Sequence, residues 1–121
     1  MKKLLIPFFL FFLSLTSVDA QVYAVAPSKA DYAAQKASGV ITFRFGADVL
    51  PETVLTKAED FQQHFNTAFD AATYTGTFTM TPNTEMNRLM LGRLLIMCGV
   101  EVVEFEGEKL PVFQFSNEQL K

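Results

Sequence analysis

Sulfur-bearing side chains are concentrated in one stretch of the chain, at Met86, Met90, Met97 and Cys98. Thioether and thiolate ligands prefer Cu(I) among the common metal ions. The three methionines are spaced by four and seven residues, so a helix would carry them on one face. The same side chains would also suit a protein core, because methionine fills irregular gaps between leucines. Copper binding is therefore the alternative function that this stretch predicts; the leading hypothesis below involves no cofactor.

Threonine occupies every second position from Thr73 to Thr81, in the run TYTGTFTMT. This alternation predicts a strand with hydroxyl groups on one face and larger apolar side chains on the other. A row of hydroxyls can bind a glycan or a peptide, although threonine is also common on the wet face of a sheet. If this face contacts a partner, we expect the contacts at Thr75, Thr77 and Thr79.

Catalytic side chains are scarce. His64 is the only histidine and Cys98 the only cysteine, and a Cys–His nucleophile would need both in one pocket with the thiol ionised. The neighbouring carboxylates Glu59 and Asp60 suit the start of a helix, where negative charge is favourable. The six glycines are isolated from one another, so no phosphate-binding loop is predicted. These observations favour a protein that is not an enzyme.

The first 20 residues have the order of a secretory signal peptide. Lys2 and Lys3 precede an apolar run from Leu4 to Leu15, and small or polar residues follow. Val18 and Ala20 are small enough for the positions three and one before a cleavage site. The apolar run is shorter than the roughly 20 residues that span a membrane. We expect cleavage near Ala20 and export to the periplasm or the extracellular space, with membrane contact only before cleavage.

Composition limits the partners of the exported chain. Removing Lys2, Lys3 and Asp19 leaves eight basic and twelve acidic residues, a formal charge of about −4, and the cations are scattered along the sequence. Nucleic acids need a basic patch, so they are not expected as partners. With one cysteine the chain has no internal disulfide, and its core must stabilise it. We expect Cys98 itself to be buried at the end of a helix.

The first half of the chain predicts two helices with one strand between them. Residues 21–38 form a lead-in segment, in which a short, loosely packed helix capped by Ser28 covers residues 28–37. Residues 39–46 alternate as a half-buried strand. A second helix is predicted from Thr56, which has a glutamate three residues later in the spacing of a capping box. Its apolar stripe is Ala58, Phe61, Phe65, Ala68, Phe69 and Ala72.

The second half predicts a helix and a hairpin after the threonine strand. The helix covers residues 84–98, with Thr81 or Asn83 as its cap, and its many leucines predict burial on more than one side. Gly99 suits the left-handed position that ends a helix. Residues 100–105 and 110–115 are predicted as two strands of a hairpin. Residues 117–121 are expected to be a disordered tail.

These elements predict an α+β domain over residues 39–116, in the order strand, helix, strand, helix, strand, strand. Two helices would pack on one face of a small, mostly antiparallel sheet as a two-layer sandwich. The order is similar to that of ferredoxin-like, BON-type and POTRA-type domains, although none of their sequence motifs is present. The leading functional hypothesis is an exported, non-enzymatic module that binds another protein or a glycan of the envelope or the extracellular space.

Overall fold

The computed structural model describes residues 21–121, and the predicted signal peptide lies outside this range. Within residues 21–121 the fold is α+β, with four α-helices and an open, six-stranded, mostly antiparallel sheet. This confirms the predicted fold class at that level. In the same range, no helix is long and apolar enough to cross a membrane.

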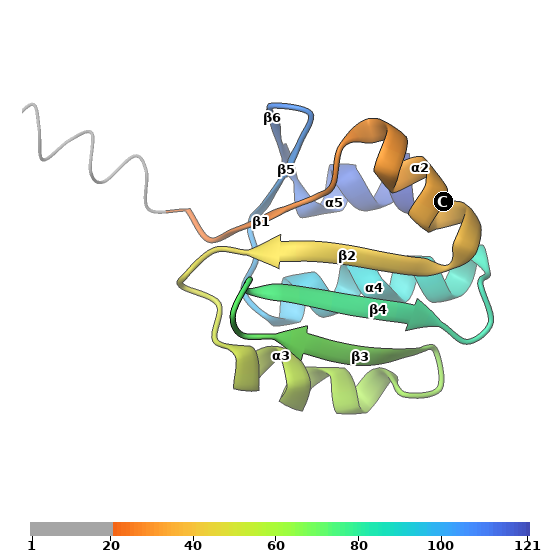
Figure 1. Cartoon of the computed structure of the whole chain (residues 1–121), viewed down its shortest axis with the longest axis horizontal. Helices are drawn as coiled ribbons and strands as arrows, with labels where there is room; N and C mark the ends of the chain where they lie inside the picture. The colour runs from red at the N-terminus through yellow and green to blue at the C-terminus, as the bar shows by residue number, and fades with distance from the viewer. Residues whose placement is uncertain (1–20) are drawn as a thin grey trace, which may run out of the picture.

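The strand order in the sheet is β3-β4-β2-β1-β5-β6 (Figure 1). Neighbouring strands are antiparallel except β1 and β5, which are parallel. The observed order along the chain differs from the predicted one, because a strand precedes the first helix and a third strand pairs with the threonine strand. The strands are β1 (Tyr23–Val25), β2 (Val40–Phe45), β3 (Phe65–Asp70), β4 (Thr75–Met80), β5 (Val102–Phe105) and β6 (Glu108–Pro111).

The helices lie mainly on one side of this sheet. Figure 1 shows α4 and α5 behind the strands and α3 running alongside β3 at the lower edge. The helical segments are α2 (Lys29–Ser38), α3 (Pro51–Ala58), the short helix η1 (Glu59–Phe61), α4 (Glu85–Met97), α5 (Val112–Phe115) and the terminal turn η2 (Ser116–Leu120). The layer of helices over the sheet encloses the hydrophobic core.

Alternation along the strands separates a core face from an open face. Phe43 and Phe78 lie fully buried under the helices, whereas Arg44 and Thr79, one position further along each strand, are exposed. Edge-to-face aromatic contacts join much of the core, and Phe115 from α5 packs against Phe43 with ring centroids 5.8 Å apart. The sheet therefore presents one dry and one wet surface, as the threonine alternation predicts.

Strand β1 lies inside the segment predicted as a lead-in. It pairs with β2 on one side and β5 on the other, and Ala24 is fully buried. The domain boundary predicted at residue 39 is therefore wrong, because residues from 23 onward belong to the sheet. A three-residue strand is too short to show an alternation pattern, which is why the sequence did not reveal it.

Helix α2 follows the prediction at its start but not in its packing. The Ser28 hydroxyl accepts a hydrogen bond from the amide of Asp31, which confirms the predicted cap. Tyr32 is buried between Phe105 and Phe115, so the helix is not loosely attached. The Gln35 carboxamide oxygen accepts a hydrogen bond from the backbone N–H of Thr42 at 2.8 Å, beyond the end of the short β1. A helix side chain thus takes the place of a neighbouring strand.

The helix predicted from Thr56 is wrong in both its start and its length. Helix α3 begins five residues earlier at Pro51, a residue suited to the first turn because its missing N–H needs no partner there. Beyond η1 the chain is the strand β3, which pairs with β4 along its whole length. Phe65 and Phe69, four residues apart, fit a strand period as well as a helical one, and pairing with β4 decides between the two.

Helix α4 matches both its predicted range and its predicted burial on more than one side. Its N-cap is Thr84, whose hydroxyl accepts a hydrogen bond from the Asn87 amide, rather than Thr81 or Asn83. The helix packs against β4, α3, α5 and η2, which confirms the predicted burial on more than one side, and its remaining side is exposed to solvent. Gly99 adopts a φ of 88°, which confirms the predicted left-handed helix end.

The C-terminal region differs most from expectation. The hairpin turn is confirmed at Glu106 and Gly107, both with positive φ. The predicted second strand ends at Pro111, and residues 112–115 form α5 instead. The predicted disordered tail is also wrong, because η2 continues the chain and the side chain of Leu120 is fully buried. A single leucine among polar residues gave too weak a periodic signal for this packing.

Candidate functional site

The open face of the sheet carries the threonines singled out in the sequence. Thr77 lies opposite Thr42 of β2 and Ala68 of β3, so small side chains form one row across three strands. Thr75 and Thr77 are half-buried and Thr79 is exposed. The structure thus brings the three predicted contact residues to one accessible surface, in which only Thr42 extends the row of threonines beyond β4.

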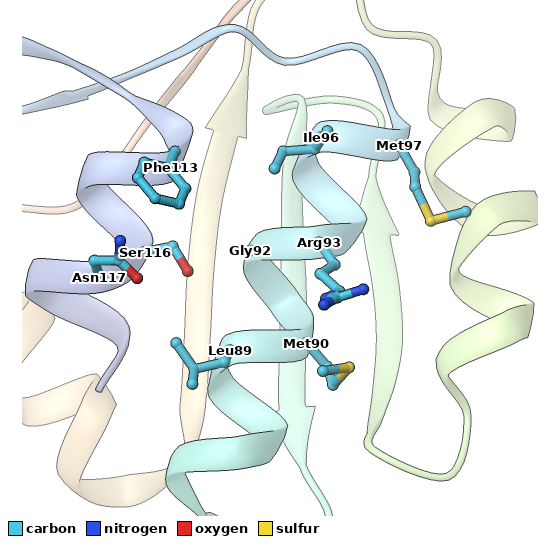
Figure 2. Close-up of a pocket in the computed structure, with 9 residues that line it drawn as sticks. All are labelled: Leu89, Met90, Gly92, Arg93, Ile96, Met97, Phe113, Ser116 and Asn117. Carbon is cyan, nitrogen blue, oxygen red and sulfur yellow. The ribbon is translucent and has the colours of Figure 1, made fainter.

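A second surface, not predicted from the sequence, is an apolar groove between α4 and the α5–η2 segment (Figure 2). Its volume is about 530 Å³. We call it the α4/α5 groove, and its lining residues are Leu89, Met90, Gly92, Arg93, Ile96, Met97, Phe113, Ser116 and Asn117. Within residues 21–121, Phe113 is the most exposed large hydrophobic side chain, at 72 %, and Ile96, which lines the groove from α4, is 54 % exposed.

The arrangement of the two helices explains why this groove is open. Figure 2 shows Leu89 and Ile96 of α4 on the side that faces Phe113 of α5, with Gly92 between them. A Cβ atom at Gly92 would lie 2.5 Å from the Ser116 hydroxyl, so glycine is what lets η2 approach α4 there. Helix α4 and η2 are in contact at Gly92, and the larger apolar side chains on either side of this contact line the open groove. Such apolar surface on a small protein is typical of an interaction site.

The predicted copper ligands are not gathered around one point. Met86 and Met97 are eleven residues apart on a regular helix, which separates them by about 16 Å along the axis. Metal–sulfur bonds are about 2.3 Å long, so one ion cannot contact both. Met86 and Met97 are also largely exposed, whereas Cys98 is buried. The four-residue ligand set predicted from the sequence is therefore wrong, because equal angular position on a helix does not make residues close along it.

Other metal ligands are not clustered either. In the described part of the chain, no group of three or more His, Cys, Asp or Glu side chains is placed to hold a metal ion. Met90 and Met97 both lie on the side of α4 away from Phe113 (Figure 2). They contribute flexible apolar surface to the lining of the α4/α5 groove, a use for which methionine is well suited.

His64 and Cys98 lie in separate environments. His64 Nδ1 is 2.8 Å from the Asn87 side-chain oxygen, and the Asn87 amide nitrogen donates to the carbonyl of Pro82. Because the Asn87 oxygen can only accept, the His64 Nδ1 carries the proton, and the imidazole links the start of β3 to α4. Burial raises the pKa of the Cys98 thiol to about 11, against a smaller lowering by Lys57. A thiol held neutral in this way is a poor nucleophile.

Sequence reasoning missed the α4/α5 groove for a specific reason. Phe113 lies in a segment that alternates like a strand, so its position on a helix facing α4 was not foreseeable. Ile96 belongs to a helix whose apolar composition suggested burial on several sides. One signal of an exposed apolar surface was available, because α4 carries more large apolar residues than a single packed face requires.

Comparison with known proteins identifies no relative of this chain. The chain matches no family model, and it resembles neither a curated protein nor a solved structure closely enough to be related to it.

Proposed function

We propose that this chain is an exported, non-enzymatic module that binds another protein of the envelope or the extracellular space through the α4/α5 groove. The observation that carries the proposal is the exposed apolar surface shared by two facing helices, with Ile96 on α4 and Phe113 on α5. Exposed patches of this kind mark protein-binding surfaces in soluble domains.

The chemistry of the groove favours an amphipathic helix as the occupant. A groove between two helices accepts a third helix that presents apolar side chains three and four residues apart. Arg93 is exposed and is the one charged residue in the lining. An acidic residue at the edge of the apolar stripe would pair with it, which favours an acidic helix over a basic one.

The open threonine face supports this proposal less strongly than the groove. Threonine hydroxyls exposed to water lose solvation when they bind, and they gain little unless each finds a partner. Apolar side chains such as Phe113 release water without that requirement, and large aromatic residues dominate most interfaces. We therefore assign Thr75, Thr77 and Thr79 to a solvated sheet surface and the partner to the opposite, helical side.

The proposal extends to the fold. The segment β2-α3-β3-β4-α4-β5 has the order of a ferredoxin-like unit. Its strands would lie in the order β5-β2-β4-β3, and the observed sheet has this order with β1 inserted between β5 and β2. A ferredoxin-like core with an added central strand is the arrangement that this topology favours.

A photo-crosslinking experiment tests the binding function in the cells that make the protein. A benzoylphenylalanine replaces Phe113, and a second strain carries it at Leu50, which is also exposed but lies at the start of α3. We expect a partner to crosslink at position 113 only, through a segment that is apolar on one helical face. A synthetic peptide of that segment should bind the purified protein, and Ile96→Asp should weaken binding by about tenfold or more.

Two results would contradict this function. Equal crosslinking from positions 113 and 50 would indicate contact without a defined site. Unchanged affinity of the peptide for Ile96→Asp would show that the groove is not where it binds. Circular dichroism of the variant provides the control for folding, because Ile96 is more than half exposed and its replacement leaves the core intact.

A further inference from the structure

The two edges of the sheet differ in how well they are protected from other strands. Edge strand β6 has four residues, among them Lys109 and Pro111, and both residue types discourage pairing. Edge strand β3 has six residues and contains neither lysine nor proline. We propose that the β3 edge is a second binding site, which takes up an extended peptide as an additional strand beside α3.

The register fixes which backbone groups of β3 are available. The Thr81 amide donates to the His64 carbonyl at 3.0 Å, which makes these two residues a hydrogen-bonded pair. Antiparallel pairs alternate, so Asn66, Ala68 and Asp70 bond to β4. The N–H and C=O groups of Phe65, Thr67 and Phe69 therefore point away from the sheet. An added strand would form its hydrogen bonds with these three residues.

A groove lies directly along this edge. It has a volume of about 480 Å³, and we call it the β3 groove. Residues of α3 and η1 line one side of it and residues of β3 line the other, and Figure 1 shows α3 running alongside β3. The lining residues are Leu55, Ala58, Glu59 and Gln62 from α3, η1 and the following turn, and Phe65, Asn66 and Thr67 from β3. A helix facing an edge strand across a groove is a common arrangement for peptide binding by strand addition.

The Thr67 hydroxyl is an independent indication of a ligand. Its oxygen is buried and has no hydrogen-bond partner within residues 21–121. Such an orphaned group is unfavourable unless a partner is supplied. Thr67 also lines the β3 groove, so a rotation of its side chain would turn this buried hydroxyl toward a peptide placed there and let it donate a hydrogen bond.

The lining also defines the chemistry of the peptide. Glu59 is the single charged residue of the β3 groove, and the apolar side chains of Leu55 and Phe65 lie beside it. A strand whose groove-facing side chains are β-branched, with one lysine or arginine among them level with Glu59, would place apolar side chains in the groove and a cation next to Glu59. The occupant we infer is a basic, extended segment of another protein. It differs in charge and in conformation from the acidic helix proposed for the α4/α5 groove.

Peptide selection followed by hydrogen exchange tests this site. A random seven-residue library displayed on phage is selected against the purified protein, and the enriched peptide is synthesised and titrated by calorimetry. We expect a basic, β-branched consensus whose binding protects the amides of Thr67 and Phe69 from exchange. Ile96→Asp should leave this binding unchanged, so failure at either groove is distinguishable from failure at the other.

Three substitutions provide the matched comparison. Thr67→Pro removes an outward N–H and should weaken binding at least about tenfold, the equivalent of one or two hydrogen bonds. Lys109→Pro removes an outward N–H from the opposite edge and should have no effect on affinity. Thr67→Val keeps the strand intact; it should weaken binding while raising the melting temperature by about 4–8 °C, because it removes the unpartnered hydroxyl.

Several outcomes would overturn the inference. These are a library that yields no enriched peptide, protection confined to α4 and α5, or wild-type affinity in both Thr67 variants. Protection of Thr67 without peptide, in a protein that sediments as a dimer, would identify a second copy of the chain as the occupant and would also overturn it.

Discussion

For two titratable side chains of this protein, burial has a larger effect on the pKa than neighbouring charges have. Among residues 21–121, Cys98 and Tyr32 are the two side chains whose pKa departs clearly from the ordinary range, and in both cases burial is the main cause. The burial of Cys98 was predictable from its position at the end of an apolar helix, and the structure confirms it. The copper site was not a sound prediction, because it considered helical angle without the rise along the axis.

The raised pKa of Cys98 predicts a specific loss of stability in alkaline solution. In the folded protein the thiol stays neutral until about pH 11, whereas its ordinary pKa is near 9. The unfolded chain therefore releases this proton first, and the contribution of the neutral thiol is present below pH 9 and is lost as the pH rises toward 11. The free energy of unfolding should fall less steeply over this range in Cys98→Ala.

Urea denaturation at intervals from pH 7 to 10.5 measures both slopes. Tyr32 is retained in both proteins, so its own alkaline titration cancels in the comparison. Parallel curves for the wild type and Cys98→Ala would show that the thiol ionises equally easily in the folded and unfolded states.

At the scale of elements, the local sequence predicts a helix well where a capping residue is followed by a run that fits the helical period and no strand period. Ser28 and the alanine-rich run after it gave α2, and the leucine-rich run before Gly99 gave α4. Segment 65–70 fitted both periods, and only its partner strand decides the outcome. The helical structure of residues 112–120 could not be predicted locally, because α5 and η2 pack on α4, which lies earlier in the chain. The α4/α5 groove could not be predicted, since it results from this late packing.

The contact between α4 and η2 predicts an unusual effect of an alanine in a helix. Alanine normally stabilises a helix by about 1 kcal/mol relative to glycine. At position 92 its Cβ would lie 2.5 Å from the Ser116 hydroxyl and 3.0 Å from the Ser116 Cβ, so the hydroxyl would have to turn away and η2 would have to shift slightly. Gly92→Ala should therefore destabilise the protein, by about 1–3 kcal/mol.

Adding Ser116→Ala to this variant provides the control. It removes the oxygen that the new methyl group meets, so the double variant should regain much of the lost stability. Thermal unfolding of the four proteins in this cycle measures the coupling. A Gly92→Ala protein more stable than the wild type would show that η2 is held away from α4 in solution.

At the scale of the whole molecule, β1 joins two parts of the sheet that would otherwise not touch. Residues 23–25 connect β2 to β5 and contribute a buried side chain, Ala24, to the core. The sequence correctly indicated a mostly antiparallel sheet covered by helices. It could not reveal β1, because three residues carry no periodic signal and their partners lie far along the chain.

This role of β1 predicts that the same substitution lowers the stability much more at position 24 than at position 25. Ala24→Asp would bury an unpaired carboxylate and should cost more than about 4 kcal/mol, enough to unfold a small domain. Val25→Asp places the same group one residue later, on the half-buried open face, and should cost much less. Urea denaturation of the two variants measures the difference. Similar small losses at both positions would mean that residues 21–27 are a dispensable extension.

The position of β1 also has a consequence for the time course of folding. The Val22 amide bonds to the Glu101 side chain across 79 residues of sequence, at the start of the parallel β1–β5 pair. Contacts over such distances close large loops and form late. The segment that leaves the ribosome first after residue 20 therefore finds its place only when β5, near the other end of the chain, has been made. If the protein is exported as proposed, nearly the whole chain must reach the far side of the membrane before its sheet can close.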